Sequence, residues 1–399
     1  MPLTPIAVRY KDRSAVLLQR RKLKMARSAH AYVRGSTVKF YEWLESSMGR
    51  SVPHGPAIWI CGDCHVSNLG PISNTKGEIE IQIRDLDQTV IGNPAHDLIR
   101  LGLSLATAAR GSDLPGVTTA RMLEQMMQGY IASLMHDKRQ QQLPKDIHLV
   151  MEDAQRRKWK HLARERIEDT RPTIPLGKKF WALSRREARE IATLFNGEPA
   201  RKLITAVRSR DDGAAVEVVD AAYWMKGCSS LGQLRYAVLA GIGPSKDESF
   251  CLIDIKEAAA AAAPRYPYQI MPRDNARRIV EGALHLSPHL GERMLAARLM
   301  DRSVIVREMF PQDLKIEIDR LERGEAMLVA RFLGQVVGRA HTRQLKRDAC
   351  KAWRADLELS HSKSLDAPSW LWSCVVDLVT THEAAYLEHC RRYAMEEIG

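Results

Sequence analysis

The sequence predicts an α+β protein of two lobes, with a small antiparallel sheet in one lobe and mainly helices in the other. At 399 residues the chain exceeds what one hydrophobic core usually supports, so we expect two lobes with a cleft between them. Two β-rich runs stand close together between residues 236 and 255, whereas long stretches on both sides have helical periodicity. Strands that are segregated from helices in this way are typical of the α+β class.

Residues 1–209 are predicted to form the first part of the helical lobe. The opening 50 residues have helical periodicity, which ends at the prolines and glycine of positions 53, 55 and 56. A short apolar run at 57–60 leads into a polar loop, and residues 78–84 (EIEIQIR) alternate as in a β-strand. From Asp97 to about residue 210 the pattern is again helical.

Residues 210–315 are predicted to form the sheet lobe. Strands are expected at 236–241 and 249–255, followed by a helix at 275–286 and a further strand at 303–309. Residues 316–399 read as helices that complete the first lobe. The chain is therefore expected to leave the helical lobe, build the sheet lobe and return.

The composition is that of an ordinary globular protein, with 45% apolar and 27% charged residues. No apolar stretch is long enough to span a bilayer, and charges interrupt the N-terminus before a signal-peptide core forms, so we expect a cytoplasmic protein without membrane contact. The net charge of +12 suggests nucleic-acid binding, but the basic residues are scattered along amphipathic stretches without a nucleic-acid motif. We therefore expect no nucleic-acid partner.

The seven cysteines are an odd number without the dense spacing of a disulfide-rich protein, so reduced thiols are expected. Cys61 and Cys64 form a CxxC, but no second pair completes a four-ligand zinc site. A structural zinc ion is therefore not predicted.

The segment 57–98 carries the residues best suited to chemistry. Asp63 and Asn68 lie five apart in a polar loop, and Asp85 follows at the end of a predicted strand. Phosphoryl transfer needs a positioned nucleophile, metal ions that bridge phosphates and cations along the triphosphate, and carboxylate and amide oxygens suit magnesium. Turn chemistry alone is the simpler explanation, but three such residues in order favour a functional site.

The run GDCHVSN, followed by IQIRDLDQTVIGNPAHDL, resembles the catalytic loop and metal segment of aminoglycoside phosphotransferases and choline kinases, which share the protein-kinase fold. The resemblance implies that Asp63 is the catalytic base, and that Asn68 and Asp85 hold magnesium. It also implies that Asp97 braces the loop from the following helix. Asp87 has no firm counterpart, but its position two residues after Asp85 leaves it able to help with a second metal ion.

The nucleotide-binding lobe, which precedes the catalytic loop in kinases, is expected here after it. The strand SFCLIDIK resembles the one whose lysine pairs with ATP phosphates, which implies this role for Lys256, with Glu281 of the next helix as its partner. The remaining expected nucleotide-binding residues lie in a glycine-containing loop and on the strand that leads to the adenine-binding hinge: Gly227, Ser229, Ser230, Gly232, Glu308 and Met309. Turn glycines, an exposed strand lysine and a surface glutamate remain open as alternatives.

This order of segments implies a circularly permuted protein-kinase-like fold, with the helical lobe divided between the two ends of the chain. From Tyr32 to the last helices the chain resembles the bacterial family called domain of unknown function 2252. We expect an ATP- and magnesium-dependent phosphotransferase that acts on a hydroxyl of a small-molecule acceptor. The alternatives are an adenylyl transferase, a protein kinase using the same site, or a non-catalytic nucleotide-binding regulator.

Overall fold

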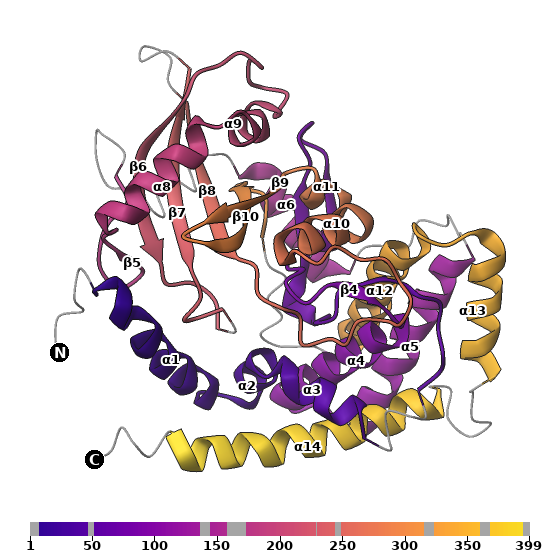
Figure 1. The fold of residues 1–399 in the computed structure, drawn as a ribbon. Helices are drawn as coiled ribbons and strands as arrows, with labels where there is room; N and C mark the ends of the chain where they lie inside the picture. Colours follow the sequence, from indigo (N-terminus) through magenta and orange to yellow (C-terminus); the bar gives the residue numbers. More distant parts are fainter. Residues whose placement is uncertain are drawn as a thin grey trace.

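The computed structural model describes residues 8–46, 52–135, 144–157, 173–228, 230–243, 249–314, 323–359 and 368–393. Within them the predicted α+β class is correct, because a six-stranded sheet with its own helices lies beside a region dominated by helices (Figure 1). All pairs of named strands in this part of the chain are antiparallel.

The large sheet has the strand order β5-β6-β7-β8-β10-β9. Its strands are β5 (Phe180–Trp181), β6 (Val216–Trp224), β7 (Arg235–Ile242), β8 (Ser249–Glu257), β9 (Met294–Leu299) and β10 (Arg302–Met309). The register places Arg235 opposite Lys256 and Asp254 opposite Arg307. Directly opposed residues, and residues two apart on a strand, project from the same side. These four charged residues therefore share one face of the sheet.

The other face of the sheet is apolar and is covered by two helices, α8 (Arg185–Asn196) and α9 (Glu198–Thr205). A capping box begins α8: the hydroxyl of Ser184 accepts from the backbone N–H of Glu187, whose side chain accepts from the backbone N–H of Ser184. The core beneath these helices includes Trp181, Tyr236 and Ile253. Because this face is closed by packing, the charged face is the one available for a site.

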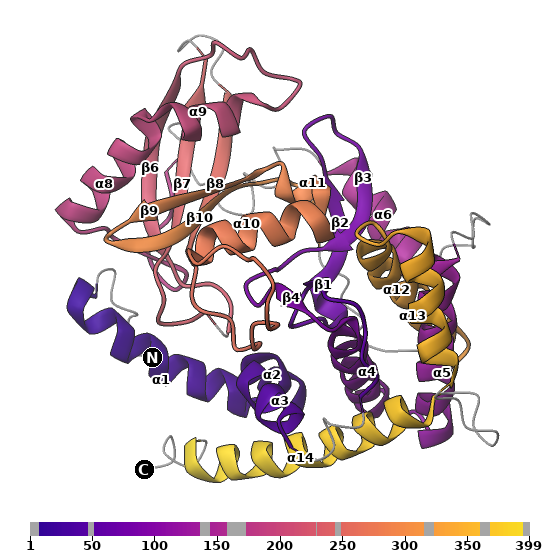
Figure 2. The same cartoon turned by 45° about the vertical axis from the view of Figure 1, so that its right-hand side comes forward.

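Two short antiparallel pairs lie between the large sheet and the helices (Figure 2). One joins β1 (Ile58–Ile60) to β4 (Val90–Gly92), and the other joins β2 (Leu69–Ser73) to β3 (Ile79–Ile83). The short helix η2 (Val66–Asn68) precedes β2. Between β10 and these pairs lie α10 (Asn275–Leu286), which contacts β9, β10 and β1, and α11 (Pro288–Gly291).

The helical region is built from both ends of the chain. Its helices are α4 (Pro94–Gly111), α5 (Gly116–Leu134), α6 (Lys145–Arg156), α12 (Arg323–Thr342), α13 (Arg347–Leu359) and α14 (Ser369–Tyr393). One hydrophobic core joins their buried residues, so that segments more than 200 residues apart in sequence pack together. Glycines bring α5 and α12 into close contact, since a Cβ at Gly129 or Gly334 would overlap a backbone carbonyl of the opposite helix.

The N-terminal helices connect the two regions along one side of the molecule. They are α1 (Tyr10–Ala26), α2 (Ala29–Gly35) and α3 (Thr37–Leu44). In Figure 1, α1 starts beside β5 and the chain continues along α14 toward the helical region. Leu17 of α1 belongs to the core of the large sheet, whereas Phe40 of α3 belongs to the helical core.

The predicted helix at 275–286 is confirmed as α10, and the strands expected at 236–241, 249–255 and 303–309 correspond to β7, β8 and β10. The sequence did not indicate β2 as a strand because it contains Gly70 and Pro71, which are rare inside strands. Within the described residues, no helix has the length and apolar character needed to cross a membrane. The protein-kinase-like arrangement, its circular permutation and the domain boundaries remain predictions.

Candidate functional site

The start of α4 positions the loop that carries Asp63. Asn93 is the N-cap of this helix, its side-chain oxygen accepting from the backbone N–H of Ala95 at 3.0 Å, and Pro94 occupies the first helical position. Asp97 therefore falls in the first turn of α4, where a carboxylate is favoured. Its two oxygens accept hydrogen bonds from the backbone N–H groups of Cys61 at 2.7 Å and Gly62 at 2.9 Å.

Gly62 is required by the shape of this loop. Its φ of +74° lies in the left-handed region, and a Cβ at this position would overlap the carbonyl oxygen of Gln88. The turn places Asp63 just beyond two backbone N–H groups that are fixed by Asp97. The contacts expected for Asp97 are thus present, and they restrain the residue that precedes Asp63.

A buried chain of hydrogen bonds continues from Asp97 into the C-terminal helices. The Nε2 atom of His341 on α12 lies 3.1 Å from an Asp97 carboxylate oxygen, and its Nδ1 atom lies 3.0 Å from the hydroxyl of Tyr130 on α5. The indole N–H of Trp353 on α13 donates to that same hydroxyl at 3.0 Å. Helices from both ends of the chain therefore support the loop.

Asp63 itself pairs with Arg100, one helical turn after Asp97 on α4. The Arg100 side chain is 1% exposed and packs over the ring of Phe40, with 5.2 Å between its guanidinium carbon and the ring centroid. The Asp63 side chain is 16% exposed. A rigid, buried cation thus orients a carboxylate that still reaches solvent. Nothing in the sequence pointed to Arg100, because its contact with Asp63 depends on how the loop folds back on α4.

Asn68 joins the Asp63 loop to the Asp85 segment. Its side-chain amide donates to the backbone carbonyl of Asp85 at 2.8 Å and to that of Asp63 at 3.3 Å. Among the described residues no hydrogen bond uses its Oδ1 atom, which is a hard oxygen suited to magnesium. The geometry therefore brings two predicted metal ligands, Asn68 and Asp85, side by side. The ring of His65 lies 3.1 Å from the hydroxyl of Ser67, a contact within the loop.

The predicted lysine of the sheet meets the predicted metal residues. Lys256 on β8 has its Nζ atom 3.4 Å from Asp85 Oδ2 and forms an ion pair with Asp87, although 171 residues separate it from Asp85. The Lys256 side chain is 5% exposed, whereas that of Asp85 is 52% exposed. A buried cation thus faces a carboxylate that remains open to solvent.

The two neighbouring carboxylates have opposite pKa shifts. Loss of hydration raises the pKa of Asp87, and the nearby charge of Asp85 raises it further, to about 6. Loss of hydration also acts on Asp85, but the cations Lys256 and Arg307 outweigh it and hold the pKa of Asp85 below its ordinary value. Asp85 is therefore ionised at neutral pH, whereas the protonation state of Asp87 can change when its surroundings change.

A second charged group lies behind Lys256 on the same sheet face. Asp254 accepts from Arg235 at 2.6 and 2.9 Å and from Arg307 at 3.1 Å, while Arg307 also donates to the backbone carbonyl of Arg84 at 3.2 Å. Burial opposes ionisation of Asp254, but the two arginines lower its pKa overall. Arg307 thus ties the sheet to the residue that precedes Asp85.

The expected ion pair between Glu281 and Lys256 is wrong. Glu281 is exposed on α10, and in the described part of the chain the carboxylates that pair with Lys256 are those of Asp85 and Asp87. One turn earlier on α10, Arg278 points inward instead. Its guanidinium donates to three backbone carbonyls: those of Thr89, Asp87 at 3.0 Å and Ala259 at 2.9 Å. Helical periodicity places residues 278 and 281 on overlapping faces, so it could not decide which one points inward.

The glycine-containing loop between β6 and β7 has the backbone expected of a tight turn. Gly227 and Gly232 have φ values of +93° and +99°, a region that other residues rarely adopt. The Ser230 hydroxyl donates to the carbonyl of Lys226 at 3.4 Å, so it is engaged within the loop. Ser229 lies outside the described residues. Turn formation therefore accounts for these glycines, and phosphate binding by the loop stays a prediction.

The two residues predicted near an adenine site have different environments. Glu308 is buried and pairs with Arg210 through both carboxylate oxygens, at 2.6 and 2.7 Å. Burial raises the pKa of Glu308 despite this partner. Met309 lies in an apolar cluster with Leu239 and Leu252 on the same sheet face as Lys256. Met309 is thus suited to contact an apolar ring, whereas Glu308 has a structural ion pair.

A metal site made only of His, Cys, Asp and Glu is not present: no group of three or more such side chains converges anywhere in the described ranges. The candidate donors are instead two carboxylates, Asp85 and Asp87, and the amide oxygen of Asn68. This hard oxygen set suits a magnesium ion that shares its coordination with phosphates and water. Cys61 and Cys64 are free, buried thiols.

The model of a family described as an uncharacterized protein conserved in bacteria matches residues 13–392, which include every candidate site residue. No curated protein and no solved structure matches the chain.

Proposed function

This chain belongs to the bacterial DUF2252 family, and we propose that it is an ATP- and magnesium-dependent phosphotransferase with a circularly permuted, protein-kinase-like fold. The observation that carries the proposal is the contact between Lys256 and Asp85, at 3.4 Å from Nζ to Oδ2. A lysine on a sheet and a carboxylate beside a polar loop are the two charges that a magnesium–triphosphate ligand needs. Their convergence across 171 residues is the support for placing both in one site.

Different residues of the chain would have different roles in such a reaction. Asn68 and Asp85, with Asp87, would hold the magnesium ion, which would neutralise negative charge on the phosphates. On ligand binding, Lys256 would separate from Asp85 and Asp87, and its ammonium group would contact the phosphate oxygens instead. The same ion pairs that satisfy a buried lysine in the free protein would thus be replaced by the ligand.

Asp63 would accept the proton of the acceptor hydroxyl as that oxygen attacks the terminal phosphorus. Arg100 holds the carboxylate in one orientation, and Asp97 fixes the backbone that precedes it. Preorganisation of this kind matters because phosphoryl transfer depends chiefly on positioning and charge.

The test is a binding and turnover experiment on the full chain with magnesium-ATP, in which water serves as the acceptor. Lys256→Met should weaken binding by about tenfold or more, since it removes a charged contact to phosphate. Asp63→Asn should leave binding within about twofold but reduce hydrolysis by about a hundredfold or more. Lys11→Met, at an exposed position of α1, is the matched control and should change neither quantity.

Absence of magnesium-ATP binding by calorimetry at millimolar concentration, or equal binding by the Lys256→Met variant, would contradict the proposal. Mass spectrometry of the products separates the alternatives, since a transferred phosphate and a transferred adenosine monophosphate have different masses. Binding without turnover in the unmodified chain would instead support a nucleotide-binding regulator.

A further inference from the structure

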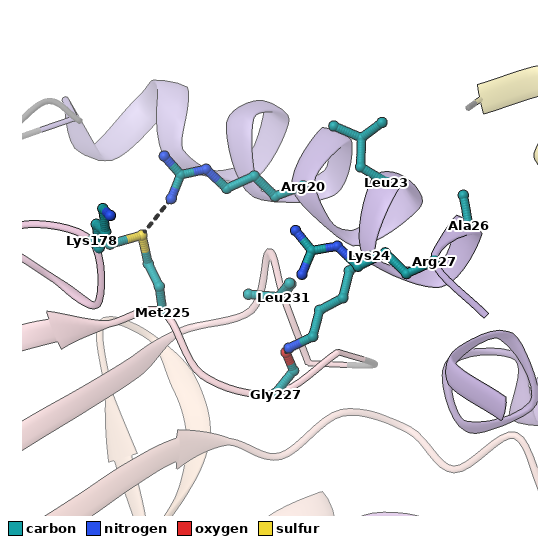
Figure 3. Close-up of a pocket in the computed structure, with 9 residues that line it drawn as sticks. All are labelled: Arg20, Leu23, Lys24, Ala26, Arg27, Lys178, Met225, Gly227 and Leu231. Atoms are coloured by element: carbon teal, nitrogen blue, oxygen red, sulfur yellow. Dashed lines mark hydrogen bonds between the residues drawn. The ribbon is translucent and has the colours of Figure 1, made fainter. Parts of the chain in front are cut away.

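A positively charged pocket lies between α1 and the glycine-containing loop, and its lining includes none of Asp63, Asp85 and Lys256. Its volume is about 520 Å³. Figure 3 shows the residues that line it: Arg20, Leu23, Lys24, Ala26, Arg27, Lys178, Met225, Gly227 and Leu231. A volume of this size is in the range of small-molecule sites.

Four of these nine lining residues are cationic, and none carries a carboxylate. Arg20 and Lys24 on α1 and Arg27, the C-cap residue of that helix, are spaced four and three residues apart, which places them on one side of it. In Figure 3, Lys24 and Arg27 extend toward the loop that carries Gly227 and Leu231. Arg20 extends toward Met225, and Lys178 lies near Met225. Two separate segments of the chain therefore bring positive charge to one hollow.

The hydrogen bonds described for these cations leave their charge uncompensated. Lys24 donates to the backbone carbonyl of Gly227 at 2.8 Å, and Arg20 donates to the sulfur of Met225 at 3.0 Å while packing over the ring of Trp181 at 5.2 Å. These acceptors are neutral. Within the described ranges, no ion pair involves Arg20, Lys24, Arg27 or Lys178.

We infer that this pocket binds a small molecule carrying two or more phosphate or carboxylate groups. Arginine and lysine side chains that converge without carboxylates lower their mutual repulsion when a multiply charged anion enters, and guanidinium groups bind such oxygens in pairs. An extended nucleic acid is the poorer candidate, because none of the residues that line the pocket is an aromatic residue on which a base could stack.

The pocket is close to the candidate nucleotide site but on the other side of the loop. Lys24 reaches the carbonyl of Gly227 from the pocket, whereas a Cβ at Gly227 would lie 3.7 Å from the Arg235 guanidinium, which pairs with Asp254 behind Lys256. An anion bound here would therefore touch the loop proposed to cover the nucleotide. The inference that an anion binds stands on the pocket and does not need the proposed reaction.

The experiment measures calorimetric binding of inorganic pyrophosphate and of citrate to the full chain, at a fixed ionic strength of about 0.15 M so that long-range charge effects are screened. The double variant Lys24→Gln/Arg27→Gln should weaken the binding of at least one of the two anions by about tenfold or more. The matched control is Lys11→Gln/Arg201→Gln, which removes the same net charge at exposed positions outside the pocket and should change binding by less than about twofold. Melting temperatures of both variants establish that they are folded.

Comparison of the two anions distinguishes a phosphate ligand from a carboxylate ligand. The inference is supported if the affinity for either anion falls in Lys24→Gln/Arg27→Gln but not in the control variant. Equal weakening in the control variant, or no binding of either anion at millimolar concentration, would overturn it. Pyrophosphate binding that is abolished by Lys256→Met would assign the anion to the nucleotide site instead. A single-stranded oligonucleotide that binds more tightly than both anions, and loses affinity steeply with salt, would replace the small-molecule assignment with a nucleic-acid surface.

Discussion

Replacement of Asp97 by asparagine removes a buried negative charge that holds the Asp63 loop, while the side chain keeps its size. Asp97 is 0% exposed. One of its oxygens accepts from Gly62, and the other accepts from Cys61 and lies 3.1 Å from His341. An asparagine that keeps its oxygen toward Cys61 must direct its own N–H₂ group at the N–H of Gly62. At least one backbone donor is then left without an acceptor in the interior.

The loss in free energy of unfolding expected for Asp97→Asn follows from these contacts. A buried donor that loses its partner costs about 1–3 kcal/mol, and loss of the charge weakens the remaining hydrogen bonds, since those to charged groups contribute about 1.5–3 kcal/mol rather than about 1 kcal/mol. We therefore expect Asp97→Asn to reduce the free energy of unfolding by about 2–4 kcal/mol. This is a large share of the stability of a typical protein, which is about 5–15 kcal/mol.

Urea unfolding followed by circular dichroism measures this loss, together with magnesium-ATP binding as a readout of the loop. Glu187→Gln is the matched control: Glu187 is equally buried and accepts from Arg13 and Tyr236, but it lies on the far face of the large sheet. Both variants should lose stability, whereas only Asp97→Asn should change nucleotide turnover. A loss of less than about 0.5 kcal/mol in Asp97→Asn would refute the assignment of Asp97 as the brace of the loop.

Three further outcomes are expected. Burial and the charge of Asp85 raise the pKa of Asp87 to about 6, so Asp87 holds its proton more tightly in the folded chain than in the unfolded chain. The stabilisation from protonated Asp87 is present below the ordinary carboxyl pKa range and is lost as pH rises through about 6. The melting temperature of the unmodified chain should therefore fall relative to Asp87→Asn between pH 4 and pH 7, and a constant difference would contradict this. Gly334→Ala should lower the free energy of unfolding in urea by about 1–3 kcal/mol, because the new Cβ would overlap the carbonyl oxygen of Met126 on α5. Ala330→Gly, which adds no atoms, serves as the comparison. An unchanged stability in Gly334→Ala would show that the two helices separate freely. Arg278→Met should cost about 3 kcal/mol or more by leaving buried carbonyls without donors, and it should weaken magnesium-ATP binding; a fully stable variant would show that water replaces the guanidinium.

Local chemistry allowed much of the Asp63 region to be predicted from sequence. The helix expected from Asp97 is confirmed as α4, which begins at Pro94 because Asn93 caps it there. The polar loop expected around Asp63 is also present, although nothing in the sequence singled out the positive φ of Gly62. The class of the fold and the strands β7, β8 and β10 followed from hydrophobic alternation.

Partners across long sequence separations could not be read in the same way. The choice between Arg278 and Glu281 depends on how α10 is rotated against β1, β9 and β10, and the pairing of Arg100 with Asp63 depends on the path of the loop. Strands with weak alternation, such as β2, are set by their pairing rather than by their own residues.

The sequence by itself thus determined the local features: an α+β composition, the helix that includes Asp97, and the polar loop that carries Asp63 and Asn68. Only the tertiary structure decided that Lys256 meets Asp85 and Asp87, that helices from both ends of the chain support Asp97 through His341, and that α1 closes a cationic pocket. The physical reason is that local backbone preference acts over a few residues, whereas these contacts are fixed by sheet register, helix rotation and the packing of a shared core.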